Sequence, residues 1–81
     1  MSTGNENEAV YAARSLGDSL ALQWCDSPAN RPDILKEALR DAAVVAAIVV
    51  GMLEHGLTDE AADFCGHVVV KAATRRARRA A

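Results

Sequence analysis

Hydrophobic residues along this 81-residue chain follow helical spacing rather than the alternation typical of strands. In residues 6–25 the apolar positions recur every three or four residues, which places them on one face of a helix. Those positions are Val10, Ala13, Gly17, Leu20 and Trp24. From Thr58 onward a second stripe of this kind contains Ala61, Phe64, Cys65, Val68 and Ala72. Both segments therefore predict amphipathic helices, the later one beginning at Thr58 as its N-cap.

The middle of the chain is apolar in every direction. Residues 32–55 predict one long helix, and within it residues 42–53 carry no polar side chain. Valine pairs in this block also suit a strand, but neither period-two alternation nor a hairpin turn accompanies them. A twelve-residue apolar run is shorter than the roughly 20 residues of a membrane-spanning helix. The block therefore indicates a buried core helix.

Proline and glycine mark the breaks between these segments. Pro28 and Pro32 lie in a polar stretch over residues 26–33, and Gly56 is suited to a left-handed C-cap of the middle helix. The expected fold is an all-α, three-helix antiparallel bundle with an apolar central helix, forming one domain over residues 1–81. Residues 1–5 are expected to be disordered, with Asn5 capping the first helix, and residues 76–81 to be a frayed basic end.

The apolar central helix predicts self-association. Two flanking helices cover only part of its surface, and a large exposed apolar strip usually marks an interaction site. Small residues at intervals of four allow close helix contact, and symmetric homodimers are the commonest oligomers. We therefore expect a homo-oligomer, with an interface formed by Ala43, Ala47, Ile48, Val50 and Gly51.

Charge is distributed unevenly. The whole chain has a formal net charge of −2, yet residues 1–70 hold all eleven acidic residues and four of the nine basic ones, a balance of −7. Residues 71–81 hold the other five basic residues and no acidic one. A basic helix of this kind neutralises phosphates, pairs with an acidic protein, or complements the negative end of its own helix dipole. The candidate binding residues are Lys71, Arg75, Arg76, Arg78 and Arg79.

The sequence contains no pattern typical of catalysis or of a cofactor site. Cys25, His55, Cys65 and His67 equal one zinc complement in number, but Cys65 and His67 are two residues apart on a helix and point in different directions. No glycine-rich phosphate loop is present. We therefore expect no metal, no cofactor and no enzymatic activity.

The polar, acidic N-terminus does not resemble a secretory signal. Together these features predict a small cytoplasmic protein that does not insert into membranes and acts as a homo-oligomer. We expect it to bind or regulate another macromolecule, most simply a protein. The alternative is a nucleic-acid-binding protein that uses the basic C-terminal helix. A helical bundle that encloses a small ligand stays open as a third class.

Overall fold

The computed structural model describes the backbone of residues 3–80 and the side chains of residues 8–79. This part of the chain contains helices and turns and no strand, which confirms the all-α prediction. The elements are α1 (Thr3–Asp26), a short 3₁₀ helix η1 (Pro28–Asn30), α2 (Arg31–Ala38), α3 (Ala42–Glu54) and α4 (Thr58–Ala80).

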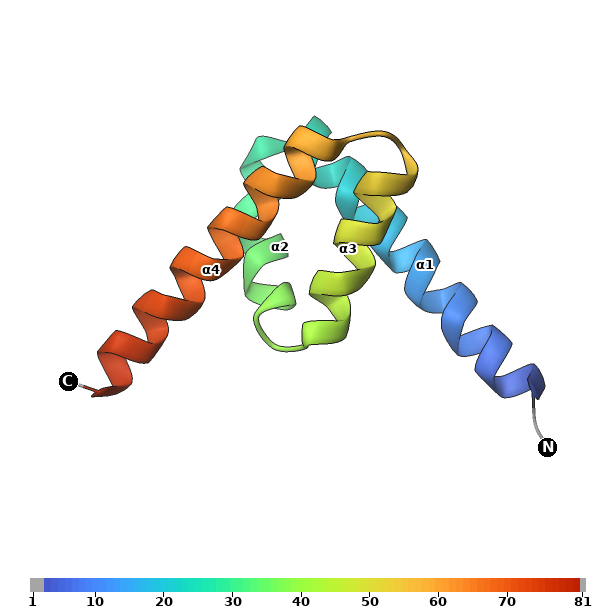
Figure 1. Cartoon of the computed structure of the whole chain (residues 1–81), viewed down its shortest axis with the longest axis horizontal. Coiled ribbons are helices and arrows are strands. Elements are labelled where there is room, and N and C mark those ends of the chain that lie inside the picture. Colours follow the sequence, from blue (N-terminus) through green and yellow to red (C-terminus); the bar gives the residue numbers. More distant parts are fainter. Residues whose placement is uncertain (1–2, 81) are drawn as a thin grey trace.

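Figure 1 shows that α1 and α4 meet at one end of the molecule and diverge from it, with α2 and α3 as a helical hairpin between them. The first half of α1 and the last half of α4 project beyond this body. The radius of gyration is 14.0 Å, larger than the roughly 12 Å of a compact chain of this length. The molecule measures 47 × 29 × 19 Å. The projecting halves of α1 and α4 therefore leave long helical surfaces uncovered.

The predicted single helix over residues 32–55 is wrong, because the chain breaks after Ala38. Asp41 adopts an extended conformation and its side chain accepts a hydrogen bond of 2.9 Å from the Ala43 backbone N–H, which caps α3. Asp is a favoured N-cap residue because its carboxylate satisfies an otherwise unpaired helix donor. The three-helix arrangement is thereby replaced by four α-helices in the described residues.

The predicted helix ends agree with the structure at two positions. Gly56 has φ +73°, the left-handed conformation expected of a C-cap, and α4 begins at Thr58. At the N-terminus, α1 already includes residues 3–5, which were predicted to be disordered, so Asn5 lies within the helix rather than before it. Helix α4 continues through residues 76–80, where fraying was predicted. Residues 1, 2 and 81 lie outside the described part of the chain.

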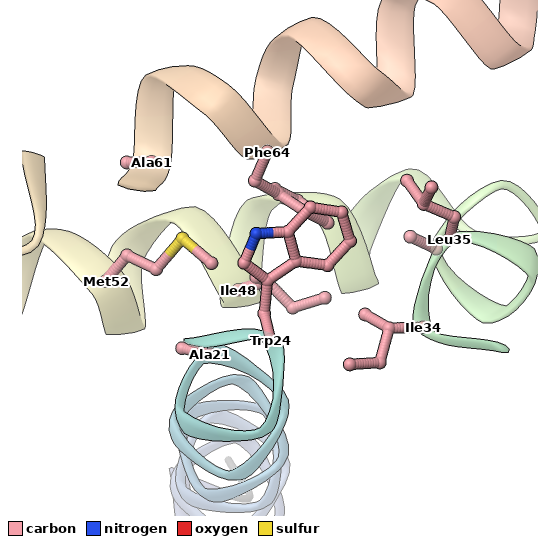
Figure 2. Close-up of a cluster of buried hydrophobic side chains, with 9 residues drawn as sticks. Ala21, Trp24, Ile34, Leu35, Ile48, Met52, Ala61 and Phe64 are labelled. Atoms are coloured by element: carbon pink, nitrogen blue, oxygen red, sulfur yellow. The ribbon is translucent and has the colours of Figure 1, made fainter. Parts of the chain in front are cut away.

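A small core is centred on Trp24, which contributes the largest buried side chain and is only 1% exposed. Its indole meets the Phe64 ring edge to face, with ring centroids 5.0 Å apart and planes at 82°. Figure 2 shows Ile48 and Met52 of α3 and Ile34 of α2 around this aromatic pair. Each of the four α-helices thus contributes to one cluster at the end where α1 and α4 meet. This cluster fixes the directions in which these two helices project.

Helices α1 and α3 cross with almost no space between their backbones. A Cβ atom added at Gly17 would lie 2.2 Å from the Ala47 carbonyl oxygen, and one at Gly51 would lie 3.0 Å from the Gly17 carbonyl oxygen. Only hydrogen fits at Gly17, so two small residues allow a close helix crossing. This contact fixes α3 against α1, and the adjoining side of α3, with Ile48 and Met52, contributes to the core.

Candidate functional site

The inner face of α4 changes from apolar to basic along its length. Residues three and four apart lie on the same side of a helix, so Phe64, Val68, Lys71, Arg75 and Arg78 form one continuous stripe. Phe64 is fully buried and Val68 is partly buried against the core, whereas Lys71 and the arginines are exposed. The face that packs on the core in the first half of α4 therefore presents cations in the projecting half.

Helix α2 supplies a second basic wall. Lys36 and the turn residue Arg40 line a groove of about 490 Å³ together with the cations of α4. We call this the basic groove. Its lining residues are Pro32, Leu35, Lys36, Leu39, Arg40, Lys71, Thr74, Arg75 and Arg78. Five of them are cationic and none is acidic, so like charges gather around one concave surface.

The two other predicted cations lie beside this groove. Arg76 and Arg79 line a neighbouring hollow of about 330 Å³, which shares Leu39 and Arg75 with the basic groove. All five predicted binding residues are therefore brought together, and Lys36 and Arg40 join them. We call these seven residues the basic surface.

The cations of the basic surface have no anionic partner within the chain. In the described residues, the contacts between basic and acidic side chains are Arg14–Glu54, His55–Asp18 and His67–Asp63, and none involves the basic surface. The Thr74 hydroxyl in the groove donates a hydrogen bond of 2.8 Å to the Val70 carbonyl oxygen. The charged groups of the groove are thus free to meet an external anion.

The predicted oligomer interface is divided by the fold. Ile48 is fully buried in the core, and Gly51 is buried in the crossing with α1. Ala47 is partly buried and touches Gly17. Only Ala43 and Val50 are exposed, and they line a shallow apolar groove of about 270 Å³ beside the projecting half of α1. The close packing predicted from the small residues of α3 is therefore used, at least for Ala47 and Gly51, by helix α1 of the same chain.

The cysteines and histidines are dispersed. No group of three side chains suited to holding a metal ion occurs in the described residues. Cys25 and Cys65 are free thiols, and partial burial, followed by the nearby Glu60 and Asp26 carboxylates, raises the pKa of the Cys25 thiol. The His67 ring instead packs against Trp24, with ring centroids 5.5 Å apart.

Within the described residues, no helix combines the length and the apolar character needed to cross a membrane. Comparison with known protein families, curated proteins and solved structures found no match for this chain.

The sequence does contain a signal for the wall formed by Lys36 and Arg40, which the predicted set of binding residues did not include. Lys36 and Arg40 are four residues apart, as are Glu37 and Asp41, and like charges at this spacing destabilise a continuous helix. In the structure α2 ends at Ala38, so neither like-charge pair lies within one continuous helix. The spacing of these charges does not predict that α2 lies opposite α4, because that arrangement depends on the break at Asp41.

Proposed function

We propose that this protein is a non-catalytic nucleic-acid-binding protein that engages the phosphate backbone through the basic groove. The observation that carries the proposal is that five cations, four from α2 and α4 and one from the turn after α2, line one groove without a carboxylate. Lysine and arginine side chains bind phosphates by charge and by hydrogen bonding, and they release the condensed counterions of the nucleic acid. The sequence left two classes of partner open, a protein and a nucleic acid. The second wall of the groove favours the nucleic acid.

The rest of the charge distribution supports the same partner. Seven of the nine basic residues lie on the basic surface, while the ten acidic residues whose side chains the structure describes lie outside the lining of the groove. A molecule with charges separated in this way has a field that orients an approaching polyanion toward one side. A nucleic acid would be steered to the groove and repelled by the acidic surfaces.

A non-catalytic role is favoured by the chemistry of the lining. The groove offers guanidinium and ammonium groups, apolar side chains and one hydroxyl. General acid–base catalysis needs a group that can accept a proton near neutral pH, such as imidazole or carboxylate. Neither is among the lining residues, so the groove is suited to binding.

Binding of a fluorescently labelled nucleic acid, followed by anisotropy at about 0.1 M salt, tests the proposal. The variant Lys36→Gln/Arg40→Gln removes two cations that do not belong to α4. If each contacts one phosphate and contributes only counterion release, affinity falls about 60-fold at this salt concentration. Arg14→Gln is the matched control, because Arg14 is exposed on α1 and pairs with Glu54 away from the groove. Equal losses in both variants, or no binding by the unmodified protein, would overturn the proposal.

We also propose that the protein acts as a homo-oligomer, with a second copy covering the outward side of α3. This side presents two large apolar side chains, Val50 and Leu53, which are 46% and 51% exposed. Sedimentation equilibrium at micromolar concentration should give a dimer or larger species, and Val50→Glu should dissociate it. Leu22→Glu is the control, because Leu22 on α1 is similarly exposed at 44% and does not line the apolar groove. A monomer under these conditions would refute oligomerisation and leave the nucleic-acid proposal intact.

A further inference from the structure

We infer that the basic groove holds one sugar–phosphate strand of a double-stranded nucleic acid and binds it without regard to base sequence. This inference rests on the proposed nucleic-acid-binding function and specifies the ligand of the same groove. Three observations carry it: the distribution of cations over two helical walls, the absence of an aromatic side chain from the lining, and the apolar floor.

The cations of α4 cover a length that spans several phosphates. With a helical rise of about 1.5 Å per residue, Lys71, Arg75 and Arg78 extend over about 10 Å of α4. One strand of a duplex carries a phosphate every 3.4 Å or so of the duplex axis, so a wall of this length lying along that axis passes about three phosphates. Lys36 and Arg40 approach from the opposite wall. The groove thus offers three to five phosphate contacts, four of them from helices and one from the turn after α2.

The aromatic side chains are placed away from the groove. Proteins that bind single strands stack the exposed bases on aromatic rings. Trp24 and Phe64 are buried in the core, and Tyr11 lies on α1, away from the groove. The groove therefore has no ring on which an unpaired base would stack. A duplex needs none, because its bases remain stacked on one another.

The floor of the groove also favours backbone contact over base reading. It contains Pro32, Leu35 and Leu39, which present hydrocarbon. Besides arginine, which also binds phosphates, the side chains that commonly read base edges by hydrogen bonding are Asn and Gln. No amide side chain lines the groove, and the only hydroxyl, that of Thr74, is occupied by the Val70 carbonyl. An apolar floor fits the carbon face of the sugars, while the walls hold the phosphates.

The salt dependence of binding by the 81-residue chain tests the inference. Labelled 20-base-pair duplexes of unrelated sequence, and their separated strands, are titrated between 50 and 200 mM salt. With three to five phosphate contacts, duplex affinity should fall about 40- to 500-fold over this range. The duplexes should differ by less than about threefold, because phosphate contacts carry no sequence information. Their separated strands should bind more weakly.

Variants connect this behaviour to the two walls. Arg75→Gln/Arg78→Gln and Lys36→Gln/Arg40→Gln should each reduce the slope of log K against log salt by about 1.8, which corresponds to two contacts. Arg14→Gln should leave the slope unchanged.

Single strands that bind as tightly as duplex, or a strong preference for one duplex sequence, would overturn the inference while the nucleic-acid-binding function stands. Failure to bind any nucleic acid at 50 mM salt, or displacement of duplex by poly-glutamate at lower concentration than by unlabelled duplex, would overturn both.

Discussion

Replacing Gly17 with alanine reverses the sign that helix propensity alone predicts. Gly17 lies in the interior of α1, where alanine is more favourable by about 1 kcal/mol because it loses less backbone entropy. In the structure, however, the added methyl carbon would lie 2.2 Å from the Ala47 carbonyl oxygen and 2.5 Å from the Ala47 carbonyl carbon. Both are backbone atoms, so no side-chain rotation relieves the contact.

The cost follows from the distance that α3 must move. An ordinary carbon–oxygen contact is more than 1 Å longer than 2.2 Å, so the two helices must separate by about this amount. Inserting a methyl group into a packed site usually costs 1–3 kcal/mol, and separating α1 from α3 also opens the core, so we expect about 3 kcal/mol. After subtraction of the propensity gain, Gly17→Ala should destabilise the fold by about 2 kcal/mol.

Gly66 provides a control with the same substitution. It also lies inside a helix, but no atom outside its own helix lies within 4 Å of its added Cβ. Gly66→Ala should therefore stabilise the protein by about 0.5–1 kcal/mol through propensity alone.

Thermal and urea unfolding, followed by circular dichroism at 222 nm, distinguishes the two variants. For a domain of this size each kcal/mol shifts Tm by about 4–8 °C. Gly17→Ala should melt at least about 10 °C below Gly66→Ala. Equal stabilisation by both substitutions would refute the close crossing of α1 and α3, because helix propensity alone would then account for the effect of alanine at both positions.

Substitutions at three further positions test other parts of the structure. Asp41→Ala should lower the free energy of unfolding by about 1 kcal/mol, measured by urea titration, while Asp41→Asn keeps an acceptor for the Ala43 N–H and should cost less. Phe64→Ala should remove about 3–5 kcal/mol and leave little cooperative unfolding by calorimetry, because Phe64 is fully buried against Trp24. The raised pKa of the Cys25 thiol means that its stabilising contribution is complete below the ordinary thiol pKa and is lost as pH rises through the folded value. Stability should therefore fall in alkaline solution above about pH 9, and less steeply in Cys25→Ala.

Helical class and helix ends were accessible from the sequence because they depend on neighbouring residues. The stripe ending at Trp24, a helix start near Thr58 and the left-handed Gly56 are local features, and the structure has all three, although Thr58 is the first residue of α4 rather than its N-cap. The break at Asp41 was missed because the apolar run that follows it dominated the pattern. A capping aspartate between two helical segments was the local signal that competed with that run.

The partner of the small-residue row could not be read from its spacing. Ala47 and Gly51 predict close packing against some helix, and a second copy and α1 satisfy that requirement equally well. Gly17 decided the matter in the folded chain, since glycine opposite glycine allows the closest crossing. A glycine within a helix is thus a signal for close approach, although propensity alone treats it as a weak point.

The shape and the charge of the basic groove have the same cause. The stripe of α4 that packs on the core through Phe64 and Val68 continues as Lys71, Arg75 and Arg78. Continuing the core along this stripe would bury unpaired charges, which costs far more than apolar packing returns. Helix α4 therefore diverges from α2 at the point where the stripe becomes basic. Arg40, in the turn that follows α2, lies on the opposite wall of the groove. The same residues that prevent the two helices from closing on each other line the space left between them, and an anion in that space would relieve the repulsion that keeps it open.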